Sequence, residues 1–273
     1  MLVVEAHGAR IPAIGLGTMT LKDALAVEVV EQALRAGYRH LDTAQMYGNE
    51  REVGEGLRRS EVPREEVFVT TKVAWQRFHA DDLRRSVDES LQRLGMPTVD
   101  LLLLHWPNPA VPLAETVAAL CKVKRAGLTR HIGVANFTTT LLSQAVELAD
   151  EPLVTNQIEV HPFLDQSKLI AACRRYGLSV TAYCPVARGR VPDNPVLRRI
   201  GSAHQKTAVQ VALRWLVQQG LIAIPRTSKI ERLADNLAVF DFELSDTEMA
   251  EITGLRRPDG RVVKPPHAPQ WDT

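Results

Sequence analysis

The chain has 273 residues, of which 45% are hydrophobic and 24% are charged. These fractions are close to the average for globular proteins, so a disordered chain and a fibrous protein are excluded, and the length is sufficient for one large core. The 33 basic and 32 acidic side chains leave a formal net charge of +1. This balance removes the simplest electrostatic argument for binding to nucleic acid or to an anionic membrane, and we expect neither partner.

The three cysteines are Cys121, Cys173 and Cys184, which are widely spaced and form no metal-binding cluster. An odd number of such cysteines is typical of reduced thiols in a cytosolic protein, so we predict a cytoplasmic location. The first ten residues carry Glu5 and His7 and lack the apolar core of a signal peptide. No apolar run approaches the ~18 residues that a membrane helix requires.

The first predicted element is a β-hairpin. Two short apolar runs, at residues 2–4 and 11–14, flank a turn at residues 6–9. Gly8 lies in this turn and can adopt a positive φ angle.

Short apolar runs then alternate with amphipathic stretches along the chain. Most of the apolar runs are continuous, which is typical of strands buried on both faces of a parallel sheet. The amphipathic stretches end just before a glycine, and the first of them places Leu25, Val29, Ala33 and Ala36 on one face. The predicted strands are residues 15–18, 39–43, 67–72, 99–105, 131–135, 154–158, 179–184 and 221–224, and the predicted helices include 24–36, 83–94, 168–176 and 208–219.

Eight strand–helix units of about 34 residues each predict a closed (β/α)₈ barrel, with the hairpin as a plug at its bottom. We expect residues 1–273 to form this single domain. The alternative is an open, doubly wound parallel sheet. Its usual dinucleotide-binding loop has three spaced glycines, whereas residues 15–20 supply only Gly15 and Gly17, so the barrel is favoured.

Ionisable side chains occur where three predicted strands end. Asp42, Lys72 and His105 lie at these ends, and Tyr47 follows Asp42 in the next loop. Taken alone, each is more simply explained as a turn former, a rim charge, a core histidine or a packing residue. In a barrel of this class, however, the active site lies at the carboxyl ends of the strands, so their joint occurrence predicts one site.

The motifs around these residues resemble those of the aldo-keto reductases. Residues 37–50 (GYRHLDTAQMYGNE) resemble the first signature of that family, and VTTK at 69–72 and LHWP at 104–107 resemble the next two. NQIEVHP at 156–162 and IPRTS at 224–228 continue in the family's order, so the resemblance covers essentially the whole chain. It implies a (β/α)₈ barrel that reduces carbonyl groups with NADPH.

The resemblance implies a catalytic tetrad of Asp42, Tyr47, Lys72 and His105. Hydride delivery to a carbonyl carbon builds negative charge on the oxygen, and Tyr47 is expected to neutralise it as the general acid. An unperturbed phenol has a pKa of ~10, and we expect the Lys72 ammonium, held by Asp42, to lower the pKa of Tyr47. His105 is expected to hydrogen-bond the substrate oxygen. This chemistry requires no metal ion.

The resemblance also implies an NADPH (NADP+) site. Asn136 and Gln157 match positions that bind the nicotinamide carboxamide, and Tyr183 matches the aromatic residue that stacks on the nicotinamide ring. Guanidinium groups suit phosphate because they form forked hydrogen bonds, which favours NADPH. The other predicted cofactor residues are Thr18 at the first strand end, Cys184, Val186 and Arg188 in the loop over the pyrophosphate, and Arg226, Thr227, Arg232 and Asn236 at the adenosine 2′-phosphate.

Three positions depart from the family pattern. Ala135 stands where serine is frequent beside the asparagine, so one hydrogen bond to the carboxamide is expected to be absent. Cys184 stands where serine is common, which weakens the hydroxyl contact expected there. Arg226 replaces the more usual lysine and retains its positive charge.

The predicted substrate pocket has an apolar wall, which suits a small-molecule aldehyde or ketone. The short tail and compact loops resemble bacterial members of the family that reduce diketo-sugar acids and methylglyoxal-like carbonyls. Trp271 has two interpretations, as a cover of the pocket or as a residue packed on the side of the barrel. The predicted wall residues are Met19, Met46, Trp75, Trp106 and Trp271.

Two other functions stay open from the sequence. The family includes channel-associated members, so the same barrel could be a nucleotide-sensing regulatory subunit, although the intact tetrad and the lack of an obvious docking extension favour an enzyme. A phosphate-binding lyase or isomerase could instead use Lys72 as the amine of a Schiff base. We expect a monomer.

Overall fold

A parallel eight-stranded sheet forms the centre of the computed structural model, which describes residues 2–272. The strands follow the order of the chain from β3 (Leu16–Gly17) to β10 (Ile222–Ala223). A parallel bridge between Ile14 and Ala223 joins the two edges, and the Gly15 amide donates to the Ala223 carbonyl at 2.9 Å. The sheet therefore closes into the predicted (β/α)₈ barrel, and the open doubly wound alternative is wrong.

All eight predicted strands are present, although the first and the last have only two residues each. Each strand pairs in parallel with its neighbours, so all carboxyl ends lie at one mouth of the barrel. The strands between the two edges are β4 (His40–Asp42), β5 (Phe68–Val73), β6 (Val99–Leu104), β7 (Thr129–Ala135), β8 (Leu153–Glu159) and β9 (Ser179–Tyr183).

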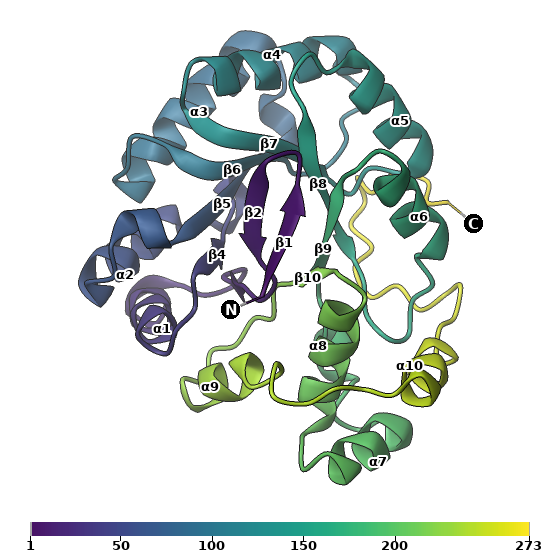
Figure 1. Cartoon of the computed structure of the whole chain (residues 1–273). Helices are drawn as coiled ribbons and strands as arrows, with labels where there is room; N and C mark the ends of the chain where they lie inside the picture. The colour runs from purple at the N-terminus through teal and green to yellow at the C-terminus, as the bar shows by residue number, and fades with distance from the viewer. Residues whose placement is uncertain (1, 273) are drawn as a thin grey trace.

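The predicted hairpin consists of β1 (Val3–Ala6) and β2 (Ala9–Pro12), and it lies in front of the barrel strands in Figure 1. Its two turn residues, His7 and Gly8, have φ angles of 46° and 82°. Two successive positive φ angles give a tight turn whose twist matches that of the strands. Apolar hairpin side chains, including Ile11, pack in one cluster with Leu101 and Leu103 of β6. The hairpin therefore covers the barrel end opposite the mouth.

Helices surround the barrel (Figure 1), and the four predicted ones correspond to α1, α3, α6 and α8. The predicted buried face of α1 is wrong at Leu25, which is 42% exposed, whereas Ala26 and Val30 are buried. Val29 and Ala33 of the same row are buried, and Ala36, just after the helix, is exposed. Steps of four residues advance by more than one helical turn, so the row reaches the core-facing side only after Leu25 and leaves it again by Ala36. The helices are α1 (Asp23–Arg35), α2 (Glu50–Ser60), α3 (Ala80–Leu94), α4 (Leu113–Arg125), α5 (Thr139–Leu148), α6 (Ser167–Arg175), α7 (Pro195–Ala203), α8 (Ala208–Gln218), α9 (Glu231–Leu237) and α10 (Asp246–Thr253).

Within residues 2–272, no helix has the length and apolar character needed to span a membrane.

Candidate active site

A buried ion pair joins the ends of β4 and β5. Asp42 pairs in register with Thr70, so Lys72 lies one side-chain repeat further along the same face of β5. Lys72 is 0% exposed, and its Nζ donates to Asp42 Oδ1 at 2.6 Å and to the Thr43 carbonyl at 2.8 Å. A buried ammonium is tolerated only when it is paired and hydrogen-bonded in this way.

Tyr47 faces this pair from a short 3₁₀ helix, Gln45–Tyr47, that follows β4. Its Oη lies 3.3 Å from Lys72 Nζ, and its ring makes an edge-on contact with the His105 ring at 5.5 Å. Gln45 fixes the 3₁₀ helix by accepting a hydrogen bond from the Ala74 amide at the end of β5. The fold therefore brings together all four residues of the predicted tetrad.

The pKa of Tyr47 differs from the expectation that the Lys72 ammonium lowers it. Burial, and after it the charges of Asp42 and Cys184, raises the pKa of Tyr47 well above its ordinary value. The expected net lowering of this pKa by Lys72 is therefore wrong, because burial disfavours the charged phenolate and the Asp42 carboxylate adds to that effect. Burial also lowers the pKa of Lys72, against the opposing effect of Asp42. The Tyr47 phenol consequently stays protonated, as a proton donor requires.

His105 follows β6 and lines the same cavity as Tyr47. Burial, and after it the charges of Lys72 and His267, lowers the pKa of His105 well below its ordinary value. Its Nδ1 is buried and makes no hydrogen bond within residues 2–272. The imidazole is therefore neutral near pH 7, and it suits an orienting hydrogen bond better than the donation of a proton.

Three polar side chains extend the tetrad across the next strand ends. Gln157 Nε2 donates to Asp42 Oδ2 at 2.7 Å. Asn136 Nδ2 donates to the His105 carbonyl at 2.9 Å, and Tyr183 Oη donates to Asn136 Oδ1 at 2.7 Å. Both ends of the Asn136 amide are thus held by the protein, whereas Gln157 Oε1 accepts no hydrogen bond from the residues that the structure describes.

A cavity of about 730 Å³ opens above these residues. It extends from Tyr47, His105 and Trp106 past Tyr183 to Arg226, and its size is within the range of sites for cofactors and small molecules. It brings together most of the predicted cofactor and substrate residues. Its lining includes Thr18, Met19, Asp42, Met46, Tyr47, His105, Trp106, Asn136, Gln157, Tyr183, Cys184, Val186, Arg188, Arg226 and Arg232.

Some predicted residues lie outside the cavity lining. The Thr227 hydroxyl donates to the Lys229 carbonyl at 3.1 Å, and Asn236 is buried in α9. Trp75 and Trp271 are not among the lining residues, but each contacts one that is, His267 and Trp106 respectively. Lys72 is shielded by its neighbours and does not line the cavity, so its amine is not placed to attack a substrate.

Positive charge gathers at one end of the cavity. Arg226 and Arg232 line it and are exposed, and neither forms an ion pair with a carboxylate in the described part of the chain.

Arg188 lines the cavity as well, with a φ angle of 50°. Two more lining residues, Asn136 and Cys184, have φ angles of 63° and 49°. Such backbone conformations are costly outside glycine and are concentrated at functional sites.

The C-terminal segment supplies part of the wall that sequence reasoning missed. Val263, Pro265 and His267 line the cavity, and the His267 ring stacks on Trp75 at 5.2 Å. Trp106 contacts His267 edge-on at 5.2 Å and Trp271 at 6.3 Å. Trp271 thus packs against a wall residue. No motif marked this segment, because only the fold carries it back to the barrel mouth.

The loop after β3 contributes further residues that were missed. Thr20 and Lys22 line the cavity, and the Lys22 ammonium donates to the Tyr47 carbonyl. Their position just beyond Thr18 and Met19 is the signal that could have identified them.

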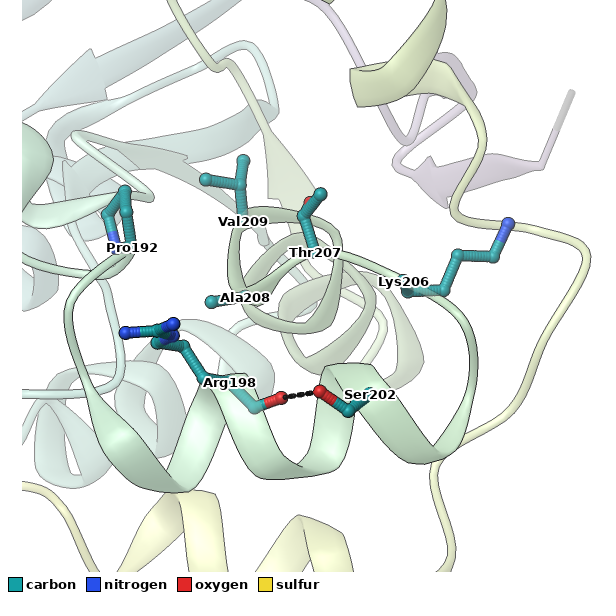
Figure 2. Close-up of a pocket in the computed structure, with 7 residues that line it drawn as sticks. All are labelled: Pro192, Arg198, Ser202, Lys206, Thr207, Ala208 and Val209. Atoms are coloured by element: carbon teal, nitrogen blue, oxygen red, sulfur yellow. Dashed lines mark hydrogen bonds between the residues drawn. The ribbon is translucent and has the colours of Figure 1, made fainter.

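A second hollow, of about 260 Å³, lies between α7 and α8 (Figure 2). Lys206 points away from it and pairs with Asp241 at 2.6 Å, and the Ser202 hydroxyl donates to the Arg198 carbonyl at 2.9 Å. The Thr207 hydroxyl caps α8 by accepting a hydrogen bond from the Gln210 amide. Apart from the Arg198 guanidinium, the polar side chains of this hollow are therefore engaged in local structure, and the large cavity is the candidate active site.

Comparisons with known proteins agree with this site. The sequence model described as "Aldo/keto reductase family" matches residues 13–257. A methylglyoxal reductase, DkgB, of Escherichia coli O157:H7 is 40% identical over 265 residues, which cover 96% of this chain and 99% of the relative.

Solved structures show the same likeness. A crystal structure named as a 2,5-diketo-D-gluconic acid reductase B superposes with a TM-score of 0.98 at 50% identity, and the match covers 100% of this chain and 98% of that one. The Bombyx mori aldo-keto reductase, solved in complex with NADP, superposes with a TM-score of 0.90 at 35% identity over 96% of this chain and 94% of that one.

Proposed function

Because the chain belongs to the aldo/keto reductase family, we propose that it reduces aldehydes or ketones to alcohols with NADPH and with Tyr47 as the general acid. The observation that carries the proposal is the placement of a protonated phenol at the cavity. Tyr47 Oη lies 3.3 Å from Lys72 Nζ, beside the neutral ring of His105. An acid and an orienting group thus face one space, which is the arrangement that carbonyl reduction requires.

In this proposal, bound NADPH supplies the hydride. Tyr47 and His105 hold the carbonyl oxygen between them, and Tyr47 gives its proton to that oxygen as negative charge develops. Lys72 holds the phenol in place through the contact of its ammonium with the Tyr47 hydroxyl, and Asp42 holds Lys72. Tyr47 is restored by a proton from solvent after the alcohol leaves.

The lining residues fit the cofactor. Gln157 Oε1 is available to accept a hydrogen bond from the nicotinamide carboxamide, and Tyr183 presents an aromatic ring beside it. At the other end, Arg226 and Arg232 supply guanidinium groups without carboxylate partners in the described chain, which suits the 2′-phosphate of NADPH.

Replacing both Arg226 and Arg232 by alanine should therefore weaken NADPH much more than NADH, because only NADPH carries the 2′-phosphate. A charge-assisted hydrogen bond contributes roughly 1.5–3 kcal/mol, so we expect at least about a tenfold loss for NADPH. Titration of the fluorescence of each cofactor measures this. Arg198→Ala, at the second hollow, is the matched control and should leave both affinities unchanged. Equal losses for the two cofactors would contradict the phosphate role.

The substrate class can be narrowed with one assay. The relatives named above reduce methylglyoxal and a diketo-sugar acid according to their names. We propose small α-dicarbonyl compounds and keto-sugar acids as the first candidates, and NADPH oxidation over a panel of these and of plain aldehydes tests the proposal. Absence of NADPH oxidation with every member would reject carbonyl reduction.

The two other functions have less support. A Schiff-base mechanism would need Lys72 to face the substrate, yet Lys72 is fully buried and outside the cavity lining. The relatives named above are reductases rather than regulatory subunits.

We also propose a monomeric, cytoplasmic protein. Outside the cavity, the exposed large apolar side chains, including Leu2, Leu25 and Leu148, come from separate segments, which is normal for a monomer surface. Cys121, Cys173 and Cys184 are free, as a reducing compartment favours. Size-exclusion chromatography with light scattering tests the monomer.

A further inference from the structure

Glu159, the last residue of β8, is a buried acid that the proposed mechanism does not use. It is 0% exposed and belongs to the NQIEVHP motif, two residues after Gln157. Burying a carboxylate is costly unless hydrogen bonds compensate the charge. Its partners therefore indicate what the residue does.

The partners of Glu159 come mainly from the C-terminal segment. Its Oε1 accepts a hydrogen bond from the Val262 amide at 2.6 Å, and its Oε2 accepts one from the Val263 amide at 3.0 Å. His161 Nε2 also lies 3.0 Å from Oε1, and Arg261 Nη1 lies 3.8 Å from Oε2. One side chain thus holds two successive backbone amides more than one hundred residues further along the chain.

The segment is fastened again near its end. The Asp272 carboxylate accepts hydrogen bonds from the Thr139 amide at 2.9 Å and from the Thr139 hydroxyl at 2.7 Å. The Arg261 guanidinium lies 3.6 Å from the centre of the Trp271 ring. In Figure 1 the C-terminal segment, in yellow, runs on the far side of the barrel from the hairpin.

The part between these two fastenings forms the substrate-side wall. Val263, Pro265 and His267 line the cavity, and His267 and Trp271 pack on Trp106 beside His105. The wall is thus a chain segment without helix or strand, and its position depends on its fastenings. Of the two carboxylates that fasten the segment, Glu159 is the buried one. It joins the wall to the strand that carries Gln157.

We propose that Glu159 is a positioning residue that fastens residues 262–272 over the barrel mouth and thereby sets the affinity for the carbonyl substrate. Glu159 itself touches no substrate in this account and acts through the segment that it holds. The inference rests on the proposed carbonyl reduction, because it concerns the affinity for that substrate.

Val262→Pro tests the fastening without changing the barrel, because proline lacks the amide hydrogen that Glu159 binds. The matched control is Val262→Ala, which keeps that hydrogen. We expect Val262→Pro to raise the KM for the carbonyl substrate roughly tenfold, as for the loss of one hydrogen bond to a buried charge, with much smaller changes in kcat and in NADPH affinity. Val262→Ala should behave like the wild type.

Glu159→Gln provides a second test. Its amide can accept only one of the two backbone hydrogen bonds and turns N–H groups towards the other donor, so the segment should come loose. Trypsin cleavage after Arg261, whose side chain is 9% exposed, measures this without any activity assay. We expect faster cleavage in Glu159→Gln than in the wild type and Val262→Ala. Val262→Pro is left out of this assay, because trypsin does not cleave an Arg–Pro bond.

Three outcomes would overturn the inference. The first is a KM of Val262→Pro that equals that of Val262→Ala, together with a cleavage rate of Glu159→Gln that equals that of the wild type. The second is parallel loss of NADPH affinity, kcat and thermal stability in both variants, which would indicate a merely structural role. The third is a wild-type chain that fails to oxidise NADPH with any of the carbonyl compounds tested. This outcome would reject the proposed function and this inference together. If the wild type does reduce carbonyl compounds, the KM and the cleavage rate of the variants test this inference separately from the proposed function.

Discussion

Tyr47→Phe is expected to lower kcat for carbonyl reduction by roughly 10²–10⁴-fold, the usual contribution of a general acid, while NADPH binds nearly as well as to the wild type. The substitution removes only the hydroxyl, which lies 3.3 Å from Lys72 Nζ, and it preserves the edge-on contact of the ring with His105. The loss should therefore appear in the chemical step. Single-turnover kinetics of NADPH oxidation, together with a titration of cofactor fluorescence, separate the two effects.

Tyr176→Phe is the matched control for this experiment. The Tyr176 hydroxyl also makes a hydrogen bond, to the Ser143 hydroxyl at 2.9 Å, but it does not line the cavity. Its removal should leave turnover unchanged. If Tyr47→Phe turned over like Tyr176→Phe, the proton would have to come from another group, and the role of Tyr47 as general acid would be rejected.

The sequence predicted the barrel and the tetrad for a physical reason. Parallel strands must all end at the same mouth, so residues at successive strand ends meet there wherever they lie in the chain. Asp42, Lys72 and His105 could be placed by this rule alone, and the family motif added Tyr47 in the following loop. Strand ends thus carry three-dimensional information that a single sequence reveals.

Two features of the site could not be predicted in this way. The C-terminal wall follows no strand, so nothing in residues 262–272 indicated that Glu159 would hold them. The net direction of the Tyr47 pKa depends on how deeply the phenol is buried and on how closely Asp42 approaches Lys72. Both are properties of packing and distance, which residue identity does not specify.

Lys72→Met should have a large effect on stability and a diagnostic effect on pH dependence. Removing one partner of a buried ion pair leaves the Asp42 carboxylate uncompensated, at a cost of about 3–5 kcal/mol in the free energy of unfolding. The double variant Asp42→Asn, Lys72→Met removes both charges, so it should regain part of that loss. Urea denaturation of the wild type, Lys72→Met, Asp42→Asn and the double variant measures the coupling, and a double variant that is destabilised by the sum of the two single changes would exclude it.

The pH dependence of Lys72→Met follows from the charges around Tyr47. Burial and Asp42 already raise the pKa of Tyr47, and without the ammonium the Asp42 carboxylate acts on the phenol unopposed. The pKa of Tyr47 should therefore rise further. Carbonyl reduction needs the phenol, so its rate falls as the pH rises through this pKa, whereas alcohol oxidation needs the phenolate and gains over the same window.

The fall in the reduction rate and the rise in the oxidation rate, the two limbs of the pH profiles, should consequently move to higher pH in the variant. The wild-type rate of reduction should be flat through neutrality. pH–rate profiles of the two directions, measured for wild type and Lys72→Met under the same conditions, decide the matter. Should the limbs keep their position while only the amplitude falls, Lys72 would act by holding Tyr47 in place. The charge of Lys72 would then be needed to neutralise Asp42 in the barrel interior rather than to shift the pKa of Tyr47.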